Sequence, residues 1–156
     1  MASLEQQLLA IQLRLQKQFD DCLNKEVAQH VKEQIMTAIS TEVYSKGIPE
    51  VYERRGGNAY GGMGNTYGTD SLADPKEMNH TVSNGVLRVT DDAMPSNLWN
   101  RDLDEAITYG YGNKNKWWNK PRPFENVAVE NMKTTNSHVE VFKEALQKRL
   151  GKGNVV

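Results

Sequence analysis

Residues 78–90 read MNHTVSNGVLRVT, and this stretch decides the fold class. Asn84-Gly85 at its centre favours a type I′ turn, the usual turn of a hairpin with a two-residue loop. In that register a mostly apolar set of side chains shares one face of the hairpin: Met78, His80, Val82, Leu87 and Val89. The opposite face is polar, as a half-buried antiparallel sheet requires. We therefore predict a β-hairpin.

Two apolar stripes at helical spacing precede the hairpin. The first stripe consists of Leu4, Leu8, Ile11 and Leu15, and the second of Ala28, Val31, Ile35, Ala38 and Ile39. Ser3 and Gln6 can form a capping box at the start of the first. One helix through both stripes would be about 60 Å long, too long for a compact domain of this size. We therefore expect a break at residues 20–24 and two helices, roughly 3–19 and 24–45. The first either projects from the body or packs as an ordinary helix.

Helical patterns return after the hairpin. One apolar helical face is formed by Phe124, Val127, Ala128 and Met132, and the next by Val139, Phe142, Leu146 and Leu150. Ser137 and Glu140 have capping-box spacing, and Gly151 suits a helix end. A short strand at 51–55 and a short helix at 102–110 complete the series. The order predicts an α+β fold, a small curved antiparallel sheet flanked by N-terminal and C-terminal helices. The predicted organisation is an N-terminal helix (1–23), a domain (24–151) and a flexible tail (152–156).

Composition excludes several classes of protein. The 156 residues carry a net charge of −1, which argues against a dedicated nucleic-acid binder. A single cysteine, Cys22, excludes a disulfide framework within the chain. No apolar run approaches the roughly 20 residues needed to span a bilayer, and no secretory signal is visible. We therefore expect synthesis in a cytosol and no membrane partner.

A search for catalytic chemistry gives no site. His30, His80 and His138 have no metal-ligand spacing. The glycine-rich segment 56–70 lacks the features of a phosphate-binding loop, and no nucleophile elbow occurs. Cys22 is expected to be a small packing residue. The sequence predicts a protein that is not an enzyme, with no catalytic residue, metal or cofactor.

The segment 113–122 combines aromatic and basic residues. Trp117 and Trp118 stand among four cations, Lys114, Lys116, Lys120 and Arg122, without an acidic residue. Aromatic stacking plus phosphate neutralisation would suit single-stranded nucleic acid. The same residue types dominate protein–protein hot spots, and the acidic net charge favours that second interpretation. A third interpretation is that one tryptophan covers the core beneath the last helices.

The order of motifs resembles a known family. The series runs VYERRG (51–56), LADP (72–75), the hairpin, Leu103…Ile107…Gly110, PRPF (121–124) and ALQKRLG (145–151). Over residues 24–151 this ordered set is similar to the minor structural, tail-component family of long-tailed bacteriophages, the neck or tail-completion proteins. The chain departs from that pattern in its Gly/Tyr-rich segment 56–70 and in the Trp117-Trp118 pair.

The resemblance implies a non-enzymatic virion protein of the head–tail junction. It implies a homomeric ring, usually of about six copies, that joins the head connector to the tail tube. The implied partners are connector or stopper proteins, tail-tube or tail-terminator proteins, and DNA contacted non-specifically in the lumen. A tail terminator and a head-side adaptor remain alternatives, as does a nucleic-acid module. We expect the interface to include Arg54, Arg55, Tyr60, Tyr67, Tyr109, Tyr111, Trp117, Trp118, Lys120 and Arg122.

Overall fold

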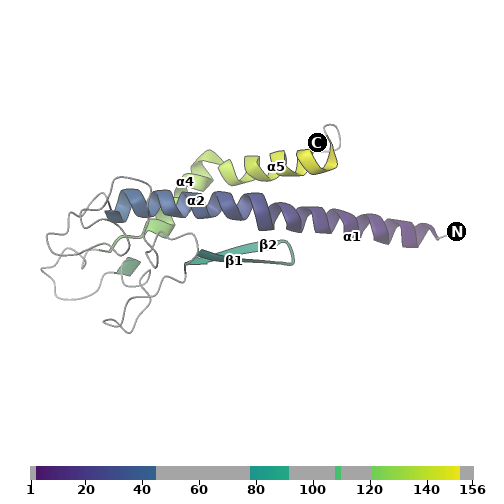
Figure 1. Cartoon of the computed structure of the whole chain (residues 1–156), viewed down its shortest axis with the longest axis horizontal. Helices are drawn as coiled ribbons and strands as arrows, with labels where there is room; N and C mark the ends of the chain where they lie inside the picture. Colours follow the sequence, from purple (N-terminus) through teal and green to yellow (C-terminus); the bar gives the residue numbers. More distant parts are fainter. Residues whose placement is uncertain (1–2, 45–77, 92–107, 110–120, 152–156) are drawn as a thin grey trace, which may run out of the picture. The chain divides into compact units, whose positions relative to one another are not determined.

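The computed structural model describes residues 3–44, 78–91, 108–109 and 121–151, and it confirms an α+β fold. Figure 1 shows its helices and its small antiparallel sheet of two strands. The elements are α1 (Leu4–Cys22), π-helical η1 (Leu23–Val27), α2 (Ala28–Ala38), π-helical η2 (Ile39–Tyr44), β1 (Met78–Ser83), β2 (Val86–Asp91), α4 (Phe124–Thr135) and α5 (Ser137–Leu150). The predicted strand at 51–55 lies outside the described residues. Of the predicted helix at 102–110, only Thr108 and Tyr109 are described, and both are helical.

The chain divides into two compact units. The described part of the first unit contains α1, η1, the start of α2, hairpin residues 80–89 and α5. The described part of the second contains the rest of α2, η2, the outer ends of the two strands, Thr108 and Tyr109, and α4.

The predicted helix break at residues 20–24 is wrong. The backbone stays helical there, and Leu23 has φ −62° and ψ −45° with its N–H directed at the carbonyls of Asp20 and Phe19. A π-helical turn, η1, replaces the break. Cys22 and Val27 on either side of this turn are buried. A π-turn accommodates one extra residue without ending the helix, so both side chains stay packed.

The capping box at the start of α1 is confirmed. The Gln6 backbone N–H donates to Ser3 Oγ at 3.2 Å, and the Ser3 backbone N–H donates to Gln6 Oε1 at 3.0 Å. Two backbone donors that the first turn leaves without helical partners are thereby satisfied. The exposed N-terminal end of α1 is therefore held helical by local chemistry.

The hairpin is also confirmed. Asn84 and Gly85 have φ values of 52° and 74°, both positive as a type I′ turn requires. Side chains of β1 and β2 alternate between covered and exposed positions, in the predicted register. The polar face is therefore the solvent-facing one.

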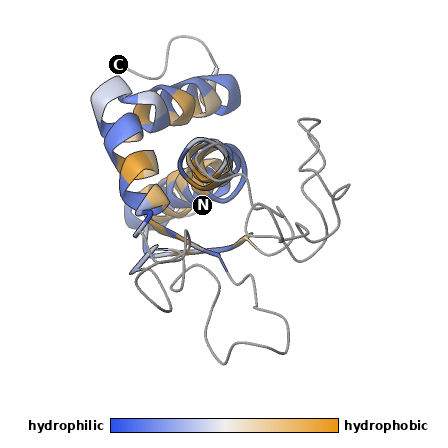
Figure 2. Cartoon of the chain, turned by 90° about the vertical axis from the view of Figure 1, so that its left-hand side faces the viewer, coloured by the Kyte–Doolittle hydropathy of each residue, from blue (hydrophilic) through white to orange (hydrophobic). Residues whose placement is uncertain are grey.

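The second unit has its own apolar core. The buried side chains are Ala38, Ile39, Val43, Met78, Phe124 and Ala128. Phe124 at the start of α4 is fully buried, and its helix presents the predicted apolar face with Ala128 and Met132. Figure 2 shows apolar residues in orange interleaved with polar ones along the C-terminal helices. Phe124 therefore anchors α4 in this core.

The first unit is held together by α5. Cys22 is buried with Ala145 and Leu146 of α5, and Phe142 and Leu150 pack against this cluster. Gly151 closes α5 with φ 85°, as predicted for a helix end. The stripe of α5 therefore faces α1 and η1.

The capping box predicted at Ser137 is wrong, although α5 does begin there. The residue before it, Asn136, has a left-handed conformation and makes no side-chain capping bond. The Ser137 hydroxyl instead lies 2.8 Å from His30 Nε2. His30 and His138 are both half-buried, and His138 Nδ1 is buried without a hydrogen-bond partner. The packing of α5 on the N-terminal helix covers them.

Candidate functional site

The first half of α1 exposes an unusual amount of apolar surface. Large apolar side chains at six positions are at least one-third exposed: Leu4 (72%), Leu8 (58%), Leu9 (57%), Ile11 (56%), Leu13 (62%) and Leu15 (38%). Single exposed apolar residues are normal on a protein surface, but a contiguous group marks an interaction site. We name these six residues the α1 surface.

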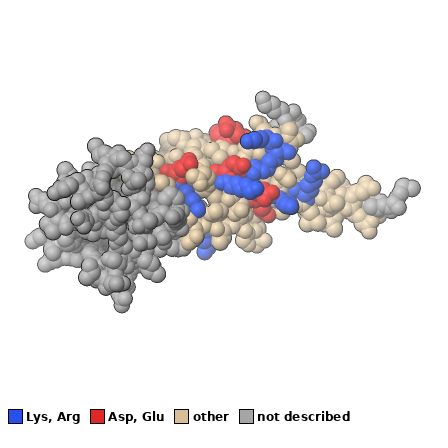
Figure 3. All heavy atoms as spheres, in the orientation of Figure 1, with Lys and Arg blue, Asp and Glu red and all other residues tan. Residues whose placement is uncertain are grey.

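The α1 surface has two faces. At about 100° per residue, the first stripe (Leu4, Leu8, Ile11 and Leu15) falls on one side of the helix. Leu9 and Leu13, which we name the second stripe, fall about 150° away from it. Glu5 and Arg14 are the only charged residues between residues 4 and 15. Figure 3 shows how few charged atoms the N-terminal part of α1 carries on the face in view.

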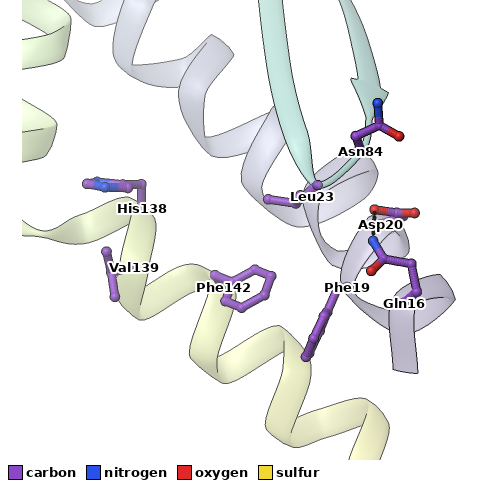
Figure 4. A pocket seen from close by; sticks show the side chains of 9 residues that line it. Gln16, Phe19, Asp20, Leu23, Asn84, His138, Val139 and Phe142 are labelled. Atoms are coloured by element: carbon purple, nitrogen blue, oxygen red, sulfur yellow. Dashed lines mark hydrogen bonds between the residues drawn. The ribbon is translucent and has the colours of Figure 1, made fainter. Parts of the chain in front are cut away.

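A groove of about 670 Å³ lies beside α1 within the first unit. Its lining comes from α1 and η1, the hairpin turn and α5: Gln16, Phe19, Asp20, Leu23, Asn84, Gly85, His138, Val139 and Phe142. Figure 4 shows Phe19 and Phe142 extending from their two helices into the space between them. Their ring centroids are 6.0 Å apart and the rings are tilted by 49°, a favourable aromatic geometry. Gln16 Nε2 donates to Asp20 Oδ1 at 3.0 Å. The groove therefore has apolar walls and a polar margin.

Arg149 fastens α5 to the N-terminal helix. Its guanidinium donates to Glu26 Oε1 at 2.9 Å and to Cys22 Sγ at 3.1 Å. The bond to Glu26 is the main cause that raises the pKa of Arg149. Burial raises the pKa of the Cys22 thiol, an effect that the nearby Arg149 charge partly opposes. The thiol therefore stays protonated and acts as a packing residue, as the sequence indicates.

Two of the predicted interface residues are described. Tyr109 is 74% exposed. Arg122 is half-buried, and its Nη1 donates to the carbonyl of Val43 at 2.7 Å. Burial lowers the pKa of Arg122, and the carboxylate of Glu42 opposes this effect. Arg122 therefore contributes to the packing of the second unit, and Tyr109 presents its ring to solvent. Outside the described residues, the positions of eight side chains stay predictions: Arg54, Arg55, Tyr60, Tyr67, Tyr111, Trp117, Trp118 and Lys120.

Sequence reasoning missed part of this site. Leu9 and Leu13 carry a signal, since they are apolar and one turn apart, but they lie off the main stripe. The contact of Arg149 with Glu26 spans 123 positions in sequence and has no local signal. Among the described residues, no group of three or more His, Cys, Asp or Glu side chains is placed to hold a metal ion. In the same residues, no helix is both long and apolar enough to cross a membrane.

Comparison with known proteins identifies one family. The YomN family model matches residues 1–148, nearly the whole chain, so this chain belongs to the YomN family. The family name derives from a Bacillus prophage, which indicates a phage origin. No curated protein and no solved structure matches the chain.

Proposed function

We propose that this member of the YomN family is a structural protein of the phage particle that works by binding other virion subunits at the head–tail junction. In this proposal it forms a ring in the neck, between the head connector and the tail tube. The ordered motifs of residues 24–151 support a function in the neck, and the phage-associated YomN family supports a place in the phage particle.

The α1 surface is the observation that carries the proposal. Six large apolar side chains stand uncovered within twelve consecutive residues of a helix that is fixed by a capping box. Such a surface favours a protein partner, because contact with one removes apolar area from water. In a structural subunit, neighbouring subunits cover such a surface permanently once the particle is assembled.

The energy available at this surface fits an assembly with several simultaneous contacts. Burying one leucine or isoleucine completely contributes about 1.5–3 kcal/mol. The first stripe is 38–72% exposed, so covering its four side chains would contribute about 3–7 kcal/mol. Association costs about 4–15 kcal/mol, so one such contact gives a weak pair at most. A closed ring or a site in a particle supplies further contacts that make the same surface effective.

Deletion of this chain from a phage that encodes it tests the proposal. Electron micrographs of the lysate should show filled heads and complete tails that are not joined. Supplying the wild-type chain from a plasmid should restore joined, infectious particles. A deletion phage that still yields normal infectious particles would contradict the neck function.

A further inference from the structure

We infer that α1 is a ring contact between copies of this chain, in which the first stripe of one copy packs on the second stripe of the next. This inference rests on the proposed ring and names the surface that builds it. It commits to a second copy of the chain as the occupant of the α1 surface. The contact is head-to-tail, because the two stripes differ.

Both stripes continue surfaces that the first unit already uses for packing. Cys22, which α5 buries, follows Leu15 by two helical turns, so the first stripe extends the α5-covered face. Gln16 and Asp20 follow Leu9 and Leu13 by two turns each. Both line the groove that reaches the hairpin turn, so the second stripe extends that side. The exposed N-terminal part of α1 therefore carries apolar side chains on the same two sides that α5 and the groove occupy further along the helix, but no element covers them there.

Two faces about 150° apart require two neighbours, because one partner helix covers only a single stripe. Two-fold pairing of identical stripes would leave Leu9 and Leu13 uncovered. In a cyclic assembly each subunit uses two different patches, one for each neighbour. The angle between those patches is close to zero in a pair and widens as the ring grows. The placement of the stripes therefore fits a ring better than a pair.

The two stripes also match in spacing. In helix packing, a side chain of one helix inserts between four side chains of its partner. The first stripe offers two successive holes of this kind, around residues 4, 7, 8, 11 and around residues 8, 11, 12, 15. The holes are offset by four residues, which is the separation of Leu9 and Leu13. Two leucines of one copy therefore fit two holes of the next with both helices running in the same direction.

The charge pattern favours a protein occupant over a lipid surface. Helices that lie on membranes carry many lysines and arginines on their polar face. Between residues 4 and 15, Arg14 is the only cation, and the polar positions are mostly glutamine. A second copy supplies leucines of the right number and spacing.

The test measures the mass of the full-length chain by light scattering over a concentration series. The wild type should form a closed oligomer larger than a dimer. Leu8→Glu, in the first stripe, and Leu13→Glu, in the second, should each give a 17.6 kDa monomer. Ala10→Glu adds the same charge outside both stripes and should keep the wild-type mass. A monomeric or dimeric wild type would overturn the inference, as would an unchanged mass for either stripe variant.

Mixing the two variants separates a head-to-tail contact from two-fold pairing. Each retains one intact stripe, so an equimolar mixture at high concentration should form a weak one-to-one dimer, held by a single contact, and nothing larger. Self-association of Leu13→Glu alone would instead show that first stripes pair with each other. Circular dichroism checks that the variants are helical. Should a variant not fold, Ile11→Cys and Leu13→Cys in a Cys22→Ala background provide the same test. They should cross-link to each other faster than either does to itself, and preferential self-cross-linking would contradict the geometry.

Binding to lipid vesicles of mixed anionic and neutral composition tests whether a membrane, and not a second copy of the chain, covers the α1 surface. A wild-type chain that stays monomeric and binds vesicles through Leu8 would identify a membrane surface and overturn the inference. The neck function has its own readout in the deletion phage. If the stripe variants dissociate as described but the deletion phage yields normal particles, the α1 contact between copies is supported and the neck function is refuted.

Discussion

Replacing Arg149 by methionine should destabilise the first unit by about 1–2 kcal/mol, since hydrogen bonds to charged groups contribute about 1.5–3 kcal/mol before screening. The guanidinium makes its bonds to Glu26 and Cys22 with only 19% of the Arg149 side chain exposed. Glu26 is 41% exposed, so solvent screens the charge that is left behind and reduces the loss. Methionine keeps most of the apolar stem, so the change measures the charge and its bonds more than the packing.

A double-mutant cycle isolates this interaction. We expect Arg149→Met and Glu26→Gln to couple by about 1 kcal/mol in urea unfolding followed by circular dichroism. The matched control is the Lys143–Glu140 pair on the same helix, whose side chains are 54% and 60% exposed. Lys143→Met and Glu140→Gln should couple by about 0.5 kcal/mol or less. If the Arg149–Glu26 coupling does not exceed that of the control pair, the assignment of Arg149 as the residue that fastens α5 is refuted.

Four further predictions follow from single positions. Phe124→Ala should cost about 3–5 kcal/mol in urea unfolding, because the ring is fully buried in the second core, and a loss below 1 kcal/mol would contradict that. Ser3→Ala should cost about 0.5–2 kcal/mol of helix stability and speed hydrogen exchange in the first turn of α1; unchanged exchange would count against the capping box. Gly85→Ala should cost about 1–2 kcal/mol through its φ of +74° alone, because no atom lies within 4 Å of the added methyl group, and no change in unfolding free energy would oppose the I′ turn. The buried Cys22 thiol should react slowly with thiol reagents until the protein unfolds, and rapid labelling of the native protein would disprove this burial. Because burial raises the pKa of Cys22 in the folded protein, the free energy of unfolding should fall as pH rises above the pKa of the thiol in the unfolded chain.

Local patterns gave correct predictions where the chemistry is local. Asn84-Gly85 determines the hairpin because both residues accept positive φ, and the flanking alternation fixes the register. Ser3 and Gln6 determine the start of α1 because both partners lie within one turn. The helix at Phe124 follows from apolar spacing that the core of the second unit uses directly.

Predictions failed where distant residues decide the structure. Asp20 and Asn24 are good capping residues, yet packing of Cys22 under α5 keeps the helix continuous through a π-turn. Ser137 has capping-box spacing, yet its hydroxyl lies within hydrogen-bond distance of His30, 107 positions away in sequence. The first stripe was visible in sequence, but its exposure was not. Exposure depends on which elements cover α1, and no local pattern encodes that.

Quantitative mass spectrometry of purified phage particles tests the central claim most directly. A structural subunit of the neck should be present in every preparation of joined particles at a constant, small copy number. It should remain with one of the two halves when heads and tails are separated, and Leu8→Glu should lower its incorporation while Ala10→Glu does not. A chain abundant in infected cells but absent from purified particles would contradict the account.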